Sequence, residues 1–250
     1  MINFSGVDNR PWYSRLLRFA LGFLPANMTM RIWQGTLCGK KWIVGSFTHG
    51  CWLGSYECQK QRIIADVIKP GTVFFDVGAH VGFYTLLASA LVEDRGRVIA
   101  FEPLPRNIEY FEKHIALNKV QNVMLIKAAV SDQPGEMRFQ EGQASSMGRI
   151  SENGTHVVEM VSLDDLVSRH AIPFPDYMKI DVEGAELFVL EGARQILRER
   201  QMTIFLATHG SDVHGKCLLL LQSLGYSCRS LDENKDLESC DEVIASNHGM

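Results

Sequence analysis

Several features that would place a chain in a familiar class are missing from these 250 residues. The six cysteines form no Cys-x-x-Cys pair and no regular framework, which argues against a disulfide-stapled secreted fold and predicts reduced thiols. No stretch approaches the roughly 20 apolar residues that cross a bilayer. The polar stretch from Met1 to Arg10 is unlike the start of a secretory signal. Together these absences predict a cytoplasmic protein without a transmembrane segment.

The chain also lacks a large excess of either sign of charge, since 29 acidic and 25 basic residues are mixed along it for a net charge of −4. A nucleic-acid partner is not expected, because no basic stripe is present. Neither an internal repeat nor a low-complexity tract occurs. What is present is a hydrophobic content of 46%, near the globular average, in a chain long enough for one large domain with a buried core.

Residues 1–70 differ in texture from the rest of the chain. Apolar side chains at helical spacing predict a helix over Arg10–Leu24 that packs on the domain, with a membrane-surface helix as the alternative. The aromatic, glycine-containing stretch Trp42–Trp52 predicts short strands and turns, and Glu57–Ile68 is predicted to form a further helix.

From Thr72 onward, apolar strands alternate with amphipathic helices. Strands are predicted over residues 73–76, 97–102, 123–128, 177–181 and 203–208, with β-like pieces at 226–231 and 242–245. Helices are predicted over residues 83–91, 108–117, 164–168, 185–199 and 213–224. This alternation predicts an α/β fold with a mostly parallel sheet covered on both faces. Ligands of such sheets bind at the carboxyl ends of the strands, where Asp76, Glu102 and Asp181 fall.

A glycine-rich turn follows the first of these strands and opens a helix. Gly78 lets a ligand approach the backbone, and Gly82 lets the helix start pack closely against the strand. The spacing is GxxxG and not GxGxxG, which weighs against a dinucleotide. Glu102 ends the next strand about 20 residues further on, where an acid commonly binds ribose hydroxyls. The alternative for Glu102 is a helix cap or a surface acid.

Five segments in order carry a resemblance to a known family: VFFDVGAHVGFYTLLAS, VIAFEPLPRNIEYFEKHIALN, AAVSD, SLDDL and YMKIDVEGAELFVLEGA. Together they resemble the FkbM-type methyltransferases, over about residues 70 to 225. The resemblance implies a Rossmann-like class I fold with a seven-stranded, mostly parallel sheet, S-adenosyl-L-methionine as cofactor, and O-methylation of a sugar, a glycan or another hydroxylated metabolite. We therefore expect a methyltransferase domain over residues 71–250. Residues 1–70 are expected to form an extension that packs on it and helps to form the acceptor site.

The same resemblance implies which residues hold the cofactor. Glu102 is expected to bind the ribose, and Ser131 and Asp132 are expected to lie near the adenine. Asp132 has a second interpretation as a cap of the turn at residues 133–135. The methionine end is expected to be lined by the residues of the first turn: Asp76, Gly78, Ala79 and Gly82.

A hydroxyl is a poor nucleophile until a base or a metal takes its proton. Asp181 and Glu183 are candidates because they flank the point where a strand meets a loop, although Glu183 has equal standing as a cap of the following helix. His209 at the next strand end is the third catalytic candidate. The chain departs here from the common family pattern L-E-x-H, since Ala207 stands where relatives carry the acid.

Weaker candidates surround these residues. His209, His214 and Cys217 superficially match metal-ligand spacing, but no fourth ligand is evident, so no metal ligand is assigned and a divalent metal is left open. His80 lies in the cofactor turn, with a solvent-facing side chain as the alternative. His49 is a candidate for an acceptor pocket with the nearby tryptophans, Trp42 and Trp52, whose alternative is ordinary core packing.

Four other functions compete with the methylation of a small hydroxylated acceptor. A dinucleotide-binding oxidoreductase is opposed by the absence of the GxGxxG spacing. A cofactor-binding module with weak catalysis is favoured by Ala207 and opposed by the intact Asp181, Glu183 and His209. Methylation of a protein is a third alternative. Methylation of nucleic acid is opposed by the negative net charge and by the absence of an NPPY-like motif.

Overall fold

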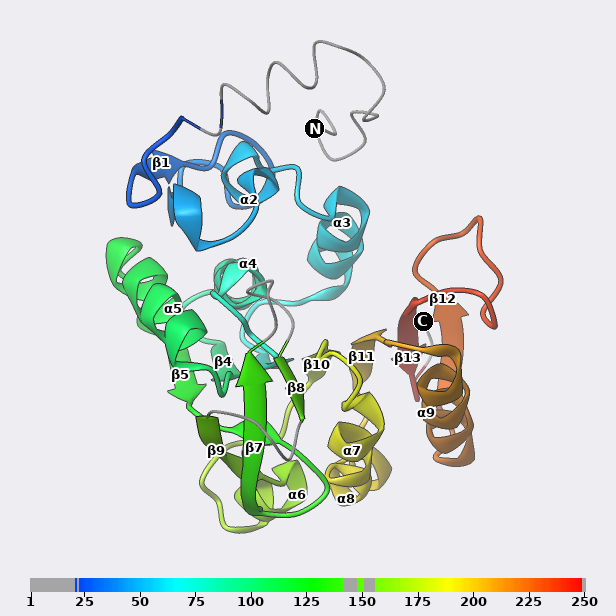
Figure 1. Cartoon of the computed structure of the whole chain (residues 1–250). Helices are drawn as coiled ribbons and strands as arrows, with labels where there is room; N and C mark the ends of the chain where they lie inside the picture. Colours follow the sequence, from blue (N-terminus) through cyan, green and yellow to red (C-terminus); the bar gives the residue numbers. More distant parts are fainter. Residues whose placement is uncertain (1–20, 22, 142–147, 151–155, 249–250) are drawn as a thin grey trace.

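The computed structural model describes residues 21, 23–141, 148–150 and 156–248. Its centre is a seven-stranded sheet in the order β12-β13-β11-β10-β3-β4-β5 (Figure 1). The strands are β3 (Val73–Val77), β4 (Arg97–Phe101), β5 (Val123–Ile126), β10 (Tyr177–Ile180), β11 (Thr203–Ala207), β12 (Ser227–Ser230) and β13 (Glu242–Ser246). Six of these strands run in the same direction, and β13 alone runs in the opposite direction. The predicted α/β fold with a mostly parallel seven-stranded sheet is confirmed.

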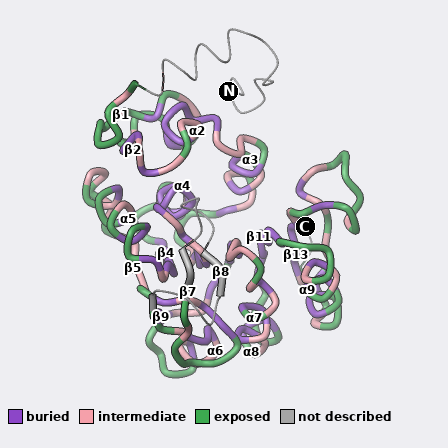
Figure 2. Tube along the Cα trace, in the orientation of Figure 1, coloured by how far each residue is buried: buried purple, intermediate pink, exposed green. Residues whose placement is uncertain are grey.

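Helices pack on both faces of this sheet, because alternate strand residues point to opposite sides. The helices that follow the strands are α4 (Phe83–Val92), α5 (Pro105–Leu117), α6 (Leu163–Ser168), α7 (Glu186–Glu191), α8 (Arg194–Glu199) and α9 (Ser211–Ser223). Phe75 and Val77 belong to a buried cluster with apolar residues of α6 to α9. Phe74 belongs to a second cluster with α4 and with the N-terminal part of the chain. Figure 2 shows the buried central strands between these layers.

The described N-terminal part of the chain packs against α4 and α5 (Figure 1). It contains β1 (Thr29–Arg31), β2 (Lys41–Ile43), the 3-10 turn η1 (Val44–Ser46), α2 (His49–Leu53) and α3 (Cys58–Val67). The Trp42 ring stacks on His114 of α5 at 3.8 Å between centroids. The predicted helix over residues 10–24 falls mostly outside the described residues.

Two local predictions differ from the structure, one of them only in part. The stretch 42–52, predicted as strands and turns, does begin in strand β2, but its last part forms the short helix α2, which ends where Gly54 adopts a left-handed φ of 72°. The helix predicted over residues 185–199 is two helices, α7 and α8, separated at Gly192. A Cβ atom on Gly192 would lie 2.0 Å from the carbonyl oxygen of Ser131, so this position has room only for glycine.

A second sheet inserted after β5 was not predicted. Its order is β6-β9-β7-β8, formed by β6 (Ala129–Val130), β7 (Gly135–Glu141), β8 (Gly148–Ile150) and β9 (His156–Val161). All six cysteines are free. In the described part of the chain, no helix combines the length and the apolar character needed to span a bilayer.

Candidate active site

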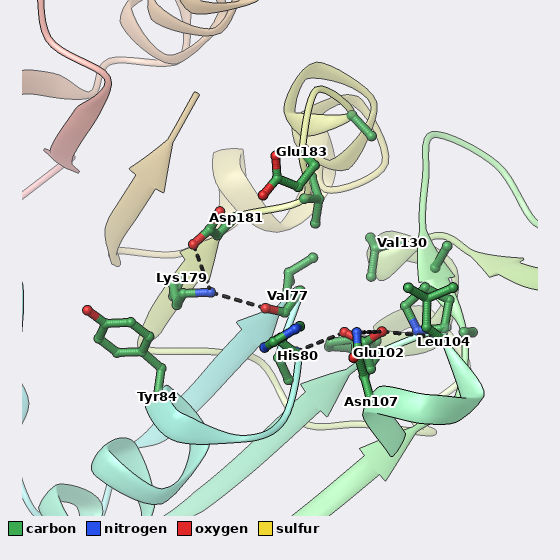
Figure 3. A pocket seen from close by; sticks show the side chains of 18 of the residues that line it. Val77, His80, Tyr84, Glu102, Leu104, Asn107, Val130, Lys179, Asp181 and Glu183 are labelled. Carbon is green, nitrogen blue, oxygen red and sulfur yellow. Dashed lines mark hydrogen bonds and ion pairs between the residues drawn. The ribbon is translucent and has the colours of Figure 1, made fainter. Parts of the chain in front are cut away.

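A cavity of about 370 Å³ lies at the carboxyl ends of β3, β4 and β10. Along the sequence, β4 and β5 follow β3 on one side of it in the sheet. The later strands β10 and β11 lie on the other side of β3. This reversal of strand order beside β3 leaves a crevice between the loops that follow β3 and β10. In Figure 3, Glu102 and Asn107 lie toward one end of the cavity, and Asp181 and Glu183 toward the other.

The turn after β3 brings backbone to the cavity wall. Gly78 has a φ of 79°, and a Cβ atom there would lie 1.9 Å from the carbonyl oxygen of Asp181. The N–H groups of Gly78 and Ala79 both donate to the carbonyl of Phe101, which anchors the turn to β4. Gly82 begins α4 with a φ of 91° and packs against the Phe111 ring. Gly78 and Ala79 line the cavity, whereas Gly82 does not.

Glu102 lies in the cavity wall with only 4% of its surface exposed. Its Oε2 accepts from the N–H of His80 at 2.8 Å, and its Oε1 accepts from the N–H of Leu104 at 2.9 Å and from Asn107 Nδ2 at 3.1 Å. Burial raises the pKa of the Glu102 carboxyl, while these donors oppose the rise. The buried Asn107 Oδ1 has no hydrogen-bond partner among the described residues, which leaves an acceptor available to a ligand.

The other predicted cofactor residues divide between the cavity and its surroundings. Ser131 lines the cavity, while the neighbouring Asp132 is exposed and accepts from Ser131 Oγ at 3.0 Å. Asp76 is fully buried behind the turn, where it accepts from Thr85 Oγ1 at 2.6 Å and pairs with Lys179 Nζ at 3.4 Å. Contacts of all these residues with a cofactor stay predictions.

The three predicted catalytic residues lie together. His209 Nε2 is 3.5 Å from Glu183 Oε2 and 3.9 Å from Asp181 Oδ1. The other ring nitrogen, Nδ1, donates to Glu186 Oε1 at 2.7 Å. The same Glu186 oxygen accepts from the N–H of Gly184 at 2.8 Å, so Glu186 and not Glu183 satisfies this amide just before α7. This arrangement turns Nε2 of His209 toward the two carboxylates beside the cavity.

The surrounding groups shift the pKa values of His209 and Asp181 in opposite directions. The hydrogen bond to Glu186 raises the pKa of His209, and Glu183 and Asp181 add to the rise, against the opposing effect of burial. Burial alone would raise the pKa of Asp181, but Lys179, Lys60 and His209 together lower it. Asp181 is therefore held as a carboxylate, and His209, whose pKa is raised, is suited to exchange a proton with an acceptor.

Sequence reasoning missed three charged residues of this site. Glu186 is fully buried beside His209, and the lysines Lys60 and Lys179 approach Asp181 Oδ2 at 3.9 and 3.6 Å. Lys179 could have been found, because residues two positions apart on a strand share a face. Lys179 of β10 therefore lies on the same face as Asp181. Lys60 lies more than a hundred residues away in the sequence, and no local pattern connects it to this strand end.

The residues that the sequence suggested for an acceptor pocket, His49, Trp42 and Trp52, do not line the cavity, and other aromatic residues do. Trp42 and Trp52 are buried in the core, and His49 accepts from Trp52 Nε1 at 3.1 Å, so the core interpretation of these tryptophans is correct. His80 lines the cavity, with its ring 4.5 Å from that of Phe47. The Phe and Tyr residues of the cavity wall are Phe47, Tyr56, Phe83, Tyr84 and Phe101.

Neither His214 nor Cys217 joins the cluster around His209. His214 contacts Thr208 Oγ1 at 2.8 Å and the Leu237 carbonyl at 2.7 Å, so both ring nitrogens are engaged in fixing the chain after β11. Ala207 pairs with Glu242 of the antiparallel strand β13. Residues directly opposite in such a pair project to the same face of the sheet. Glu242 thus places a carboxylate beside the position where Ala207 has none.

A family model described as the methyltransferase FkbM domain matches residues 76–228, which include the turn, Glu102, Asp181 and His209. The chain belongs to the FkbM methyltransferase family. The sequence-based assignment to this family and to its enzyme class is confirmed. The matched region excludes Lys60 and Glu242.

Curated relatives of this FkbM-family chain are methyltransferases from varied organisms. A hexuronic acid methyltransferase, AglP, of Haloferax volcanii is 25% identical over 70% of this chain and 72% of the relative. The 31-O-demethyl-FK506 methyltransferase FkbM of Streptomyces tacrolimicus is 26% identical over 64% of this chain and 74% of its own. The 2-O-methyltransferase NoeI of Sinorhizobium fredii is 26% identical over 61% of this chain and 68% of its own.

Solved structures share the fold of this FkbM-family chain. The crystal structure of a methyltransferase FkbM from Methylobacillus flagellatus superposes with a TM-score of 0.50 at 16% identity, over 79% of this chain. Only 52% of that longer chain is covered, so the present chain spans about half its length. A putative rRNA-methylase from Clostridium thermocellum gives a TM-score of 0.50 at 15% identity, over 76% of this chain and 92% of its own. The predicted class I methyltransferase fold is thus confirmed.

Proposed function

We propose that the chain is an S-adenosyl-L-methionine-dependent O-methyltransferase that acts on a hydroxyl of a sugar, a glycan or another hydroxylated metabolite. One observation carries the proposal: a single cavity joins a glycine-rich turn and a buried strand-end acid to two carboxylates, Asp181 and Glu183, whose oxygens approach the ring of His209. The relatives, which include a hexuronic acid methyltransferase and a 2-O-methyltransferase, support a hydroxylated acceptor.

The turn and Glu102 suit the cofactor. The absence of a side chain at Gly78 keeps backbone at the cavity wall, where the methionine part of the cofactor would lie. Glu102 would accept from the ribose hydroxyls, and the unpartnered Asn107 Oδ1 offers a second acceptor close by. Ser131 would contact the adenine side. Bound in this way, S-adenosyl-L-methionine would supply an electrophilic methyl group directed toward Asp181 and His209.

The residues at the reaction end suit the removal of a proton from a hydroxyl. His209 Nε2 would take the acceptor proton while Glu186 holds Nδ1–H and so fixes the reactive tautomer. Asp181, kept ionised by two lysines, would stabilise the imidazolium that forms. Glu183 approaches the same nitrogen and would add to this effect. The base in this mechanism is therefore His209, with Asp181 and Glu183 as anionic partners.

Phe47 and Tyr56 would form the acceptor wall of the cavity. Both belong to the N-terminal extension, and the Phe47 ring meets Tyr56 at 5.6 Å and His80 at 4.5 Å between centroids. Aromatic rings supply a large apolar face at low entropic cost, which suits packing against a sugar ring. The extension would thus form part of the acceptor site, as the sequence predicts.

Asp181, Glu183 and His209 offer ligand atoms within 4.8 Å of one another, the one such group in the described part of the chain. However, the ammonium groups of Lys60 and Lys179 already face Asp181 Oδ2. Two cations beside one ligand oppose a divalent ion, so the group is a poor fit for a resident metal. Treatment with EDTA is expected to leave activity unchanged, and a loss reversed by added Mg²⁺ or Mn²⁺ would contradict this expectation.

The proposal is tested by calorimetric titration with S-adenosyl-L-methionine, S-adenosylhomocysteine and NAD, followed by a methyl-transfer screen of neutral sugars, uronic acids and polyols. Binding of both adenosyl ligands without NAD, together with transfer to a hydroxyl, is the expected result. Binding without transfer to any small acceptor would favour a cofactor-binding module or a methyltransferase of protein. Failure of both adenosyl ligands to bind a folded sample would overturn the proposal.

A further inference from the structure

A buried lysine from outside the family-matched region approaches Asp181, which lines the reaction end of the cavity. Lys60 lies on α3, and its side chain is 3% exposed. Its Nζ is 2.6 Å from Glu242 Oε1 on β13, 3.3 Å from Glu57 Oε2 and 3.9 Å from Asp181 Oδ2. Lys60 therefore joins three parts of the chain that are far apart in the sequence.

Lys60 acts with a second buried ammonium group. Lys179 Nζ lies 3.6 Å from the same Asp181 oxygen and donates to the carbonyl of Gly78 at 3.2 Å. Both ammonium groups lie over the Tyr84 ring, at 5.2 and 5.4 Å from its centroid. Figure 3 shows Lys179 between Asp181 and the turn after β3. The two oxygens of Asp181 thus differ: Oδ2 faces the lysines, and Oδ1 faces His209.

A lysine this deeply buried requires anionic partners, and Glu57 and Glu242 already supply two. A purely structural link between α3 and β13 would need nothing more. The approach to Asp181 has a further consequence, because opposite charges 3.9 Å apart interact appreciably at a partly buried site. The positive charge of Lys60 offsets part of the negative charge that Asp181 presents to the cavity.

We propose that Lys60 is a specificity-determining residue that weakens the attraction of Asp181 for the sulfonium of S-adenosyl-L-methionine relative to the uncharged thioether of S-adenosylhomocysteine. The inference rests on the proposed function, which places the reacting sulfur near Asp181. In the transfer, an oxygen lone pair forms the new C–O bond, the electrons of the C–S bond remain on sulfur, and the acceptor proton goes to His209. The sulfur loses its positive charge in this step, so a neighbouring ammonium favours the direction of transfer.

The test compares the affinities of the two adenosyl ligands by calorimetry at pH 8. In Lys60→Met, the affinity for S-adenosyl-L-methionine relative to S-adenosylhomocysteine is expected to rise by about three- to tenfold, since a nearby cation is removed. Lys60→Arg keeps the charge and is expected to keep the wild-type ratio. Lys113→Met is the matched control, because Lys113 forms an exposed pair with Glu109 on α5.

Thermal unfolding would reveal whether Lys60→Met folds. Glu242→Gln is a second variant that tests the proposal if Lys60→Met does not fold. Removal of this anion leaves Lys60 less compensated, so the affinity ratio is expected to move in the opposite direction, toward S-adenosylhomocysteine. An unchanged ratio in the folded Lys60→Met or Glu242→Gln protein would overturn the role of Lys60 alone. Failure of the wild-type protein to bind either ligand would instead overturn the proposed function.

Discussion

Glu102 and Asp181 are both strand-end carboxylates of the same cavity, yet their pKa values move in opposite directions. Burial raises the pKa of Glu102, whose partners are neutral amides. Burial acts on Asp181 as well, but the ammonium groups of Lys179 and Lys60 reverse its effect. A neutral hydrogen-bond donor offsets the cost of burying a charge less than a full opposite charge does. The two acids are therefore suited to different tasks.

At the residue scale, Glu102→Gln tests the cofactor end. The amide keeps the shape of the side chain but loses the charge and one acceptor oxygen. The dissociation constant for S-adenosylhomocysteine is expected to rise by about tenfold or more, because hydrogen bonds to charged groups contribute roughly 1.5–3 kcal/mol. Calorimetry measures the change, with the exposed Glu109→Gln as control. A change below about twofold would exclude a role for Glu102 in holding the ribose.

Glu186→Gln tests the reaction end. Because the bond to Glu186 is the largest cause of the raised pKa of His209, its removal is expected to lower that pKa. A base must be deprotonated to act, so wild-type activity should rise with pH through a value above 6.5, and the variant should reach its plateau at lower pH. NMR titration of the His209 imidazole measures the shift without an acceptor. An unchanged His209 titration would refute this role, and the exposed Glu199→Gln serves as control.

At the scale of elements, the start of α8 depends on a side chain from another helix. Asp164 of α6 accepts from the N–H groups of Gln195 and Ile196 at 2.8 and 2.9 Å, which satisfies two amides that an isolated helix start leaves unpaired. The packing of Gly192 against the Ser131 carbonyl breaks the preceding helix. The apolar periodicity continues across this break, which is why a single helix over residues 185–199 was predicted.

Asp164→Ala is expected to lower the free energy of unfolding by about 1–2 kcal/mol, because α8 loses its cap. The neighbouring Asp165→Ala is a matched control, since Asp165 pairs with the mostly exposed Arg169 and should contribute less than about 1 kcal/mol. Urea denaturation of both variants measures the difference. Equal destabilisation by the two substitutions would show that the cap makes no special contribution to stability.

At the scale of the whole molecule, one histidine connects the N-terminal extension to the cofactor turn. His114 of α5 accepts from the N–H of Ile43 through Nε2 at 3.1 Å and donates from Nδ1 to the carbonyl of Val81 at 2.8 Å. This pattern requires the neutral ring, which also stacks on Trp42. Burial lowers the pKa of His114 from 6.5 to about 4. The folded protein therefore resists the proton that the unfolded chain accepts.

This difference predicts a pH-dependent loss of stability. Because the folded pKa is depressed, the stabilisation is complete above pH 6.5 and is lost as the pH falls toward about 4. The loss amounts to about 1.4 kcal/mol for each pH unit in that window. Urea denaturation between pH 7 and pH 4 should show a shallower decline for His114→Gln than for the wild type. Parallel pH profiles would show that other groups cause the acid sensitivity.

The sequence by itself determined the order of strands and helices, the glycine-rich turn and the strand-end acids of the cavity. These are local properties, because the periodicity of apolar residues and the end of a strand can be seen within a few neighbouring positions. The resemblance to the FkbM family extended them to a cofactor and a reaction class. The inserted sheet of β6 to β9 was not apparent, since its longest strand, β7, carries several polar residues and no long apolar run.

Only the tertiary structure decided which charges meet. Lys60 and Glu242 are separated by 182 positions, and they come together because α3 and β13 pack beside the same strand end. Glu242 stands opposite Ala207 through the register of two antiparallel strands, which no local pattern specifies. The protonation of His209, Asp181 and His114 depends on burial and on charges brought from other elements. The sequence therefore names the acids of this site, and packing sets which remains charged and which group exchanges the proton.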